Sequence, residues 1–234
     1  MPAVWADSLI VLDLYDNDMT GSIPSKISAL SNLQQLVLGA NSLEGSIPDE
    51  IGQYMVQLTV LNLEANNLTG RAMPSSLSNL GNLTVLRLGN NAAMEPDFLA
   101  EYVSTRWPLL EELRLPGLRL RGNLNNVDWR NLRNLRILDL SNNFLENFPV
   151  EITFCDDLEE LNLSDNLELG GNVPSSINEL ANLKHLLLAN AGLAGNLTAS
   201  LGSLPKLGTY IVGDELGSAR VSSFSHVFMP DEPF

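Results

Sequence analysis

The 234-residue sequence is poor in cysteine, in aromatic residues and in long apolar runs. Its single cysteine, Cys155, excludes a disulfide within the chain. Aromatic residues make up 6% of the chain while hydrophobic residues make up 44%, so the core must be mainly aliphatic. No run of 18 apolar residues occurs, and the sequence therefore predicts no membrane span in this chain.

Basic residues are also scarce. The chain has 13 lysines and arginines against 28 aspartates and glutamates, which gives a formal net charge of −15. Nucleic acids and anionic membrane surfaces attract clustered positive charge, so neither is predicted as a partner, although the same balance is typical of a well-solvated surface. The stretch MPAVWADSLIVLDL has neither the basic start nor the small-residue cleavage site of a signal peptide, as would also hold for a mature or truncated chain.

The sequence does contain an internal repeat, which decides the expected fold. Steps of 23 to 27 residues separate the first leucines of eight units, which are Leu9, Leu33, Leu58, Leu83, Leu110, Leu135, Leu158 and Leu183. A weaker ninth unit begins at Leu207. No composition shift or linker interrupts the series, so we predict one domain over 1–234, with eight repeats in 9–206 and a degenerate repeat or C-terminal cap in 207–234.

Each unit predicts a short strand followed by a return path. In L-x-x-L-x-L the alternate leucines point inward, and strands of successive units should stack in parallel into a curved sheet. Proline lacks the N–H that a ladder needs, so Ile47 and Pro48 mark the turn into the return path. Segments such as SKISALSN and SSLSNLGN are short, which predicts 3-10 turns or single helical turns.

Two columns of the repeat alignment place asparagines and a cysteine in the interior. An asparagine eight positions after the first leucine should bond the backbone around it, because an unsatisfied buried amide costs about 1–3 kcal/mol. This predicted structural ladder comprises Asn17, Asn41, Asn66, Asn91, Asn143 and Asn166. Leu118 and Ala191 replace the asparagine in units five and eight. Cys155 falls in a column of inward leucines, which favours a buried thiol over a reactive or metal-binding one.

With these columns in place, the chain resembles leucine-rich-repeat proteins over residues 9–206. More narrowly it resembles the plant-type subclass, whose unit is L-x-x-L-x-L-x-x-N-x-L-x-G-x-I-P. The segments LIVLDLYDNDMTGSIP and LQQLVLGANSLEGSIP match that unit, with Met19 in place of one leucine. The resemblance implies an α/β repeat fold, a right-handed solenoid with a curved parallel sheet on its concave face and short 3-10 or irregular segments on its convex face.

The resemblance also implies a non-catalytic scaffold that binds a protein or peptide through its concave face. Extracellular members usually carry cysteine-paired caps, which this chain lacks, so we expect a longer chain before it or a partner covering its end. Three alternatives remain open: a fragment of a receptor-like ectodomain, an inhibitor of a secreted hydrolase, or a structural subunit of a larger assembly.

No constellation of residues predicts catalysis, a metal site or a cofactor. His185 and His226 lie far apart in the sequence, and neither has metal-ligand spacing to another histidine, a cysteine or a carboxylate cluster. Phosphate-binding loops, G-x-S-x-G and kinase segments are absent from the sequence. The sequence therefore predicts a protein that is not an enzyme.

Outward strand positions supply the candidate partner-binding residues, because they carry no folding duty. We predict that a protein or peptide contacts the concave face at Tyr15, Glu64, Arg87, Glu112, Arg114, Asp139, Asn162 and His185. Arg87 and Arg114 should be neighbours there, and Glu112 and Asp139 could neutralise them. Just before the strands, Glu111, Arg136, Glu159 and Lys184 alternate in the sign of their charge. We interpret these charges as helping to fix the register of the stacked strands rather than as a binding site.

Two further features carry competing interpretations. Possible glycosylation sites are Asn67, Asn82 and Asn196, although the repeat consensus itself readily generates N-L-T, and a glycan on the fourth sequon, Asn162, would block the sheet surface. Seven of the 13 basic residues lie between Arg106 and Arg136, within the irregular units four and five. This basic island is a candidate for a special contact or, equally, a set of locally paired charges.

Overall fold

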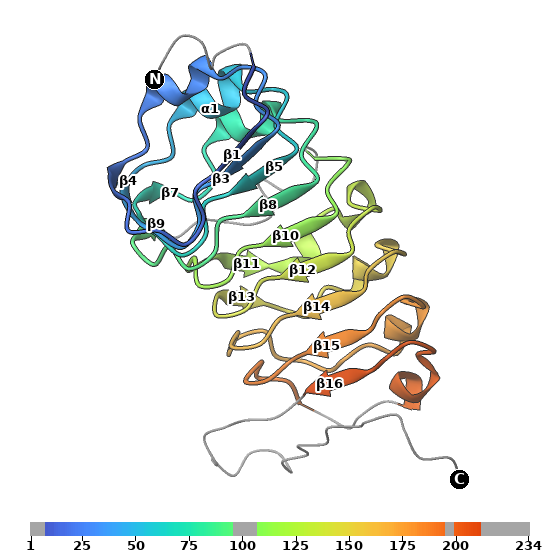
Figure 1. The fold of residues 1–234 in the computed structure, drawn as a ribbon. Helices are drawn as coiled ribbons and strands as arrows, with labels where there is room; N and C mark the ends of the chain where they lie inside the picture. The colour runs from blue at the N-terminus through green and yellow to red at the C-terminus, as the bar shows by residue number, and fades with distance from the viewer. Residues whose placement is uncertain (1–7, 96–106, 195–198, 212–234) are drawn as a thin grey trace.

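Nine parallel strands form the main sheet of the computed structural model, which describes residues 8–95, 107–194 and 199–211. Each strand has three residues: β1 (Val11–Asp13), β3 (Gln35–Val37), β5 (Val60–Asn62), β8 (Val85–Arg87), β10 (Glu112–Arg114), β12 (Ile137–Asp139), β14 (Glu160–Asn162), β15 (His185–Leu187) and β16 (Thr209–Ile211). Their order in the sheet is their order in the chain, so every repeat adds one strand beside the last. The expected solenoid of stacked parallel strands is confirmed (Figure 1).

Short strands on the carboxyl side of the main sheet form a second set of ladders, visible on the left of Figure 1. One ladder contains β2 (Thr20–Ser22), β4 (Ser42–Gly45) and β6 (Asn67–Leu68); two more pair β7 (Gly70–Arg71) with β9 (Met94–Glu95) and β11 (Arg121–Asn123) with β13 (Phe144–Glu146). All of them except β11 follow a ladder asparagine; β11 follows Leu118, which takes that place in unit five. In these repeats the chain therefore bends after its main strand before it returns.

The return paths are short helical turns, as the sequence predicts. There is one six-residue α-helix, α1 (Asp49–Tyr54), among the described residues, and the 3-10 turns are η2 (Ser25–Ala29), η3 (Ser75–Asn79), η4 (Leu124–Asn126), η5 (Trp129–Asn131), η6 (Val150–Phe154), η7 (Ser175–Glu179) and η8 (Ala199–Ser203). A proline immediately precedes α1 and most of the five-residue turns. Its fixed φ and missing N–H suit the residue that enters such a turn.

The strand register matches the columns of the repeat alignment. Leu36 pairs with Leu61, Leu61 pairs with Leu86, and all three side chains are fully buried. The core continues through every repeat without a break. Because identical positions meet identical surroundings in a stacked repeat, a single leucine pattern is enough to build it.

Non-leucine residues in the inward columns are buried and bonded. The indole Nε1 of Trp107 donates to the Leu77 carbonyl at 3.1 Å, and that of Trp129 donates to the Leu124 carbonyl at 3.1 Å. Cys155 is fully buried, and burial raises the pKa of its thiol to about 12. The thiol is therefore a small hydrophobic group at neutral pH, in agreement with its place in a leucine column.

The column asparagines tie neighbouring repeats together. Asn66 Nδ2 donates to the carbonyls of Leu63 at 3.1 Å and Leu38 at 3.0 Å, while its Oδ1 accepts the N–H of Leu43 at 2.9 Å. Asn41, Asn91 and Asn166 make corresponding bonds. Asn17, in the first unit, bonds only the carbonyls of Leu14 and Tyr15.

Unit five, where Leu118 replaces the asparagine, is supported by its neighbour. Asn143 Oδ1 accepts both the Leu118 N–H at 3.2 Å and the Leu120 N–H at 2.9 Å. Its Nδ2 donates to the carbonyls of Leu115 and Leu140, each at 2.9 Å. The bonds to Leu120, Leu115 and Leu140 correspond to those of the other ladder asparagines, and the bond to the Leu118 N–H is additional.

Candidate binding face

Side chains that alternate with the inward leucines form three rows across the outer surface of the main sheet. The first row is Val11, Gln35, Val60, Val85, Glu112, Ile137, Glu160, His185 and Thr209. The second row is Asp13, Val37, Asn62, Arg87, Arg114, Asp139, Asn162, Leu187 and Ile211. The third row is Tyr15, Gly39, Glu64, Gly89, Pro116, Ser141, Ser164 and Ala189, as the backbone bonds beyond the strands indicate.

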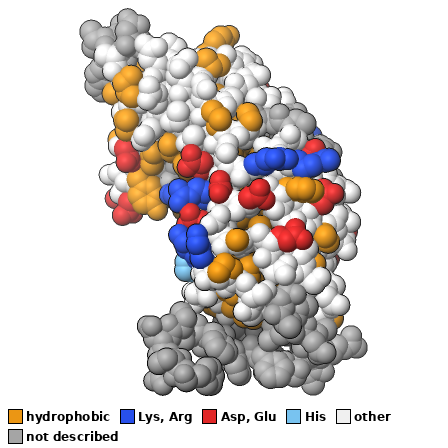
Figure 2. All heavy atoms as spheres, turned by 90° about the vertical axis from the view of Figure 1, so that its right-hand side faces the viewer, with side chains coloured by type: hydrophobic (Ala, Val, Ile, Leu, Met, Phe, Trp, Pro, Cys, Tyr) orange, Lys and Arg blue, Asp and Glu red, His pale blue; other side chains and the backbone are white. Residues whose placement is uncertain are grey.

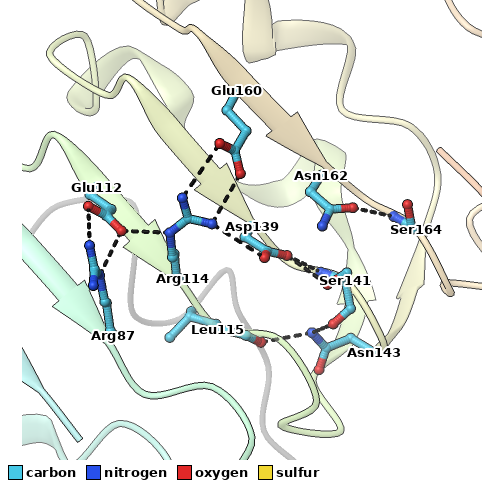
Figure 3. A network of polar contacts seen from close by, with 10 residues as sticks. All are labelled: Arg87, Glu112, Arg114, Leu115, Asp139, Ser141, Asn143, Glu160, Asn162 and Ser164. Atoms are coloured by element: carbon cyan, nitrogen blue, oxygen red, sulfur yellow. Dashed lines mark hydrogen bonds and ion pairs between the residues drawn. The ribbon is translucent and has the colours of Figure 1, made fainter. Parts of the chain in front are cut away.

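An ion-pair network occupies the middle of these rows (Figure 3). Arg87 and Arg114 are register partners on β8 and β10, as predicted. Arg87 Nε donates to Glu112 Oε1 at 2.7 Å and its Nη2 donates to Oε2 at 3.0 Å. Arg114 Nε donates to the same Oε1 at 2.6 Å. Glu112 therefore lies between two guanidinium groups and offsets their mutual repulsion.

The second partner of Arg114 is Glu160, which the sequence reasoning did not select. Arg114 Nη1 donates to Glu160 Oε1 at 3.0 Å, whereas its distance to Asp139 Oδ2 is 3.7 Å. Asp139 was expected to help neutralise the arginines, and it forms an ion pair with Arg114 that is too long for a hydrogen bond. The repeat alignment does place Glu160 in the first row, two strands beyond Glu112. Comparing the rows one column at a time did not show that the Arg114 and Glu160 side chains meet diagonally across β12.

Burial and hydrogen bonding set the charge states in the network. Burial raises the pKa of Glu112, but hydrogen bonds from Arg87 and Arg114 outweigh it and leave the pKa below its ordinary value. The bond to Glu112 raises the pKa of Arg87. For Arg114, burial lowers the pKa and is outweighed by the bonds to Glu112 and Glu160. All three groups are thus charged at neutral pH.

Several second-row residues also close the ends of their own strands. The side-chain Oδ1 accepts the backbone N–H two residues later in four repeats, with Asp13–Tyr15, Asn62–Glu64, Asp139–Ser141 and Asn162–Ser164 as the pairs. This is the Asx-turn geometry that aspartate and asparagine share. Asp139 Oδ1 additionally accepts the Ser141 hydroxyl at 2.7 Å. Asn162 and Asp139 therefore have a structural duty, and only part of each side chain is free for a partner.

The remaining predicted residues do not gather around the network. Tyr15 follows β1, is 46% exposed, and places its ring beside Gly39. Glu64 Oε1 accepts a bond from Asn62 Nδ2 at 3.2 Å. His185 is exposed at the start of β15, near the opposite end of the sheet from Tyr15. A ligand that touches all of them must extend along the sheet.

Charges beside the face are largely paired with each other. Glu159 binds Arg136 and Lys184, both about half exposed, and these bonds lower the pKa of Glu159 to about 2. Figure 2 shows this side of the molecule, where lysine and arginine side chains lie among aspartate and glutamate side chains instead of forming a continuous basic field.

Within the basic island, Arg130 pairs with Asp128 at 2.8 Å, and Arg121 lies over the Phe144 ring, 5.6 Å from its centroid. Arg106 lies outside the described residues. Three members of the island, Arg114, Arg130 and Arg136, are ion-paired, which favours the interpretation of local pairing over a basic docking site.

The predicted sequons differ in surroundings. Asn67 and Asn82 are exposed, and Asn82 Nδ2 donates to the Val56 carbonyl at 3.1 Å. Asn162 is half-buried on the sheet, while Asn196, like His226, lies outside the described residues. The structure does not test whether any sequon is used, so glycosylation stays a prediction.

In residues 8–95, 107–194 and 199–211, no three histidine, cysteine, aspartate or glutamate side chains are grouped so as to hold a metal ion. No helix in the same ranges has the length and hydrophobicity that a membrane crossing requires.

Comparison with known proteins gives matches throughout the repeat region. The family model for the Leucine Rich Repeat matches residues 8–30, 32–54 and 134–155. Receptor protein-tyrosine kinase CEPR1 of Arabidopsis thaliana is 34% identical over 148 residues, which cover 62% of this chain and 15% of that protein.

Two solved structures are similar over nearly the whole chain. The ectodomain of the Arabidopsis receptor kinase HAESA, in complex with an N-terminally extended IDA peptide hormone, has a TM-score of 0.82 at 27% identity, covering 91% of this chain and 36% of that one. The plant peptide hormone receptor RGFR1, in complex with RGF2, has a TM-score of 0.78 at 31% identity, covering 92% and 34%.

The chain thus spans about a seventh of CEPR1 and about a third of each of the two solved receptor chains (15%, 34% and 36%). Within that span, the similarity rests on the same features that build the fold: the leucine columns and the parallel strand stack. The repeat, the fold and these matches show that the chain is a leucine-rich-repeat protein with the plant-type repeat.

Proposed function

We propose that this protein is a non-catalytic scaffold that binds a protein or peptide on its concave sheet face. The observation that supports this most directly is the similarity to the HAESA ectodomain in complex with an IDA peptide hormone and to the plant peptide hormone receptor RGFR1 in complex with RGF2. Leucine-rich-repeat folds of this kind are rigid stacks whose outward strand positions are free of folding duty, which suits them to recognition. Among the alternatives, the similarity favours a receptor-like ectodomain over a hydrolase inhibitor or a structural subunit.

We place the contact at the centre of the face, around Arg87, Glu112, Arg114 and Asp139. The network holds these side chains in one arrangement, because each arginine is fixed by at least two charge-assisted bonds. A partner that contacts them loses less conformational freedom than one that contacts free side chains. The arginines remain partly exposed, at 35% and 26% of their side-chain surface, so a partner can reach them.

Selected peptides test this placement. A random peptide library displayed on phage is panned against the purified chain, and the dissociation constants of selected synthetic peptides are measured by calorimetry. The double variant Arg87→Glu/Arg114→Glu should change the dissociation constant at least about tenfold, because it breaks the network and reverses its positive charges: an acidic peptide should bind more weakly and a basic peptide more tightly. Arg130→Glu is the matched control, since Arg130 is equally an ion-paired arginine but lies in η5, outside the sheet face.

Folding must be monitored alongside. Far-ultraviolet circular dichroism and thermal melts establish that the double variant retains the stack, since strand and 3-10 content would fall if the repeats separated. An unchanged dissociation constant in a folded double variant would refute the placement. An equal change in Arg130→Glu would show that net charge, and not the sheet face, governs binding.

A further inference from the structure

The sheet face carries an excess of negative charge despite its two prominent arginines. Five carboxylates lie in its rows, Asp13, Glu64, Glu112, Asp139 and Glu160. Two guanidinium groups oppose them, which leaves three negative charges uncompensated by the residues of the face. Asp13 and Glu64 make no ion pair within 4.0 Å in the described chain; their bonds go to the Tyr15 N–H and the Asn62 amide.

The two arginines are poorly placed to receive an anion. Arg87 already holds both oxygens of Glu112, and Arg114 holds Glu112 and Glu160. A ligand carboxylate would enter a network that already has three carboxylates, with Asp139 at 3.7 Å from Arg114, for its two cations. It would add like charge to an acid-rich site, which costs affinity and slows association.

Aliphatic side chains lie beside these charges. Val60 and Val85 are register partners on β5 and β8, and Val37 lies on the adjacent β3; all three are half-buried. Tyr15 adds an exposed ring next to Gly39. Half-buried aliphatic groups in a row of strands offer apolar contact area to an extended ligand that alternates its side chains.

Resting on the proposed function above, we propose that the occupant of this face is an extended peptide segment with lysine or arginine side chains separated by aliphatic ones. Its cations meet the uncompensated carboxylates, and Asp13 and Glu64 bracket the aromatic and aliphatic end of the face. Its aliphatic side chains cover Val37, Val60 and Val85. Charge complementarity selects this occupant over an acidic peptide, which would meet only arginines that are already bonded.

Composition of the selected peptides is the first test. Panning at about 50 mM salt should enrich lysine, arginine and aliphatic residues and deplete aspartate and glutamate. A synthetic selected peptide should bind at least about tenfold more weakly at 200 mM salt, because several charge contacts at an exposed face are screened. The same peptide with its basic residues changed to glutamate should not bind measurably.

Variants of the chain localise the effect. Asp13→Asn/Glu64→Gln should weaken the cationic peptide about tenfold, as two exposed ion pairs each contribute about threefold. Both changes are nearly isosteric, and the new asparagine keeps the oxygen that accepts the Tyr15 N–H. Glu151→Gln is the control, because Glu151 is an exposed acid on η6 away from the sheet and should leave affinity within about twofold.

The outcomes separate this inference from the proposed function. Selection of acidic peptides whose binding is lost in Arg87→Glu/Arg114→Glu overturns the cationic occupant and leaves concave-face binding standing. Cationic peptides that bind Asp13→Asn/Glu64→Gln as tightly as the parent chain also overturn it. Binding that no sheet-face variant alters removes both proposals together.

Discussion

Asn143→Ala is the substitution whose effect the structure defines best. Asn143 is 3% exposed and, like the other internal ladder asparagines, bonds the backbone of two repeats; it also accepts the N–H of Leu118, which stands where unit five lacks an asparagine. Its removal strands the N–H groups of Leu118 and Leu120, and it takes one donor from the carbonyls of Leu115 and Leu140. Each buried donor left without a partner costs about 1–3 kcal/mol, so the two N–H groups alone predict a loss of about 4 kcal/mol.

Asn17→Ala is the matched control. Asn17 occupies the same position in unit one, yet it is exposed and bonds only two carbonyls, which water can reach after the substitution. We expect it to cost about 0.5 kcal/mol or less, as surface changes usually do. The same chemical change thus gives two very different results, set by burial and by the side-chain bonds that Asn143 makes to the preceding repeat.

Urea unfolding followed by circular dichroism measures both variants, and native-state hydrogen exchange resolves the site. Repeat stacks can lose cooperativity, so the slope of each transition must be compared as well as its midpoint. The amides of Leu118 and Leu120 should exchange much faster in Asn143→Ala and should be unaffected in Asn17→Ala. Free energies of unfolding for the two variants that agree within about 1 kcal/mol would refute the argument from unsatisfied backbone groups.

The same structure supports three further predictions, on Glu112, Cys155 and Gly52. Glu112→Gln should cost about 2 kcal/mol at pH 7, and because the folded pKa of Glu112 lies below its ordinary 4.5, the difference from the parent should shrink in unfolding curves taken below that pH. Cys155 should resist a thiol reagent at about pH 8 until urea unfolds the chain, and a native thiol that reacts at the rate of a free thiol would contradict its burial. Since the pKa of Cys155 rises from 9.0 to about 12 on folding, the free energy of unfolding should fall as the pH rises above 9.0. Gly52→Ala should lower the thermal midpoint, because the added Cβ would lie 2.2 Å from the Ser76 carbonyl, while Gly81→Ala, which meets open space, should leave it unchanged.

The sheet face shows the limit of prediction from the columns of the repeat alignment. Arg87 and Arg114 were placed side by side from the alignment alone, because parallel strands in register bring equivalent positions together. Asp139 does form an ion pair with Arg114 at 3.7 Å, as expected, but the hydrogen-bonded partner at 3.0 Å is Glu160, which was not predicted. Long side chains reach diagonally across a neighbouring strand, and their direction depends on competing bonds such as those of Asp139 to Ser141.

By itself the sequence determined the stack: its repeat period, its strands, its inward leucines and the burial of Cys155. It could do so because a solenoid translates one environment along the chain, so that a recurring residue reports a recurring neighbourhood. Only the tertiary structure decided how Asn143 serves a repeat that lacks its own asparagine, and which carboxylates hold the two arginines. Those outcomes depend on contacts between unlike positions of different repeats, where the periodicity carries no information and side-chain reach and burial select the partner.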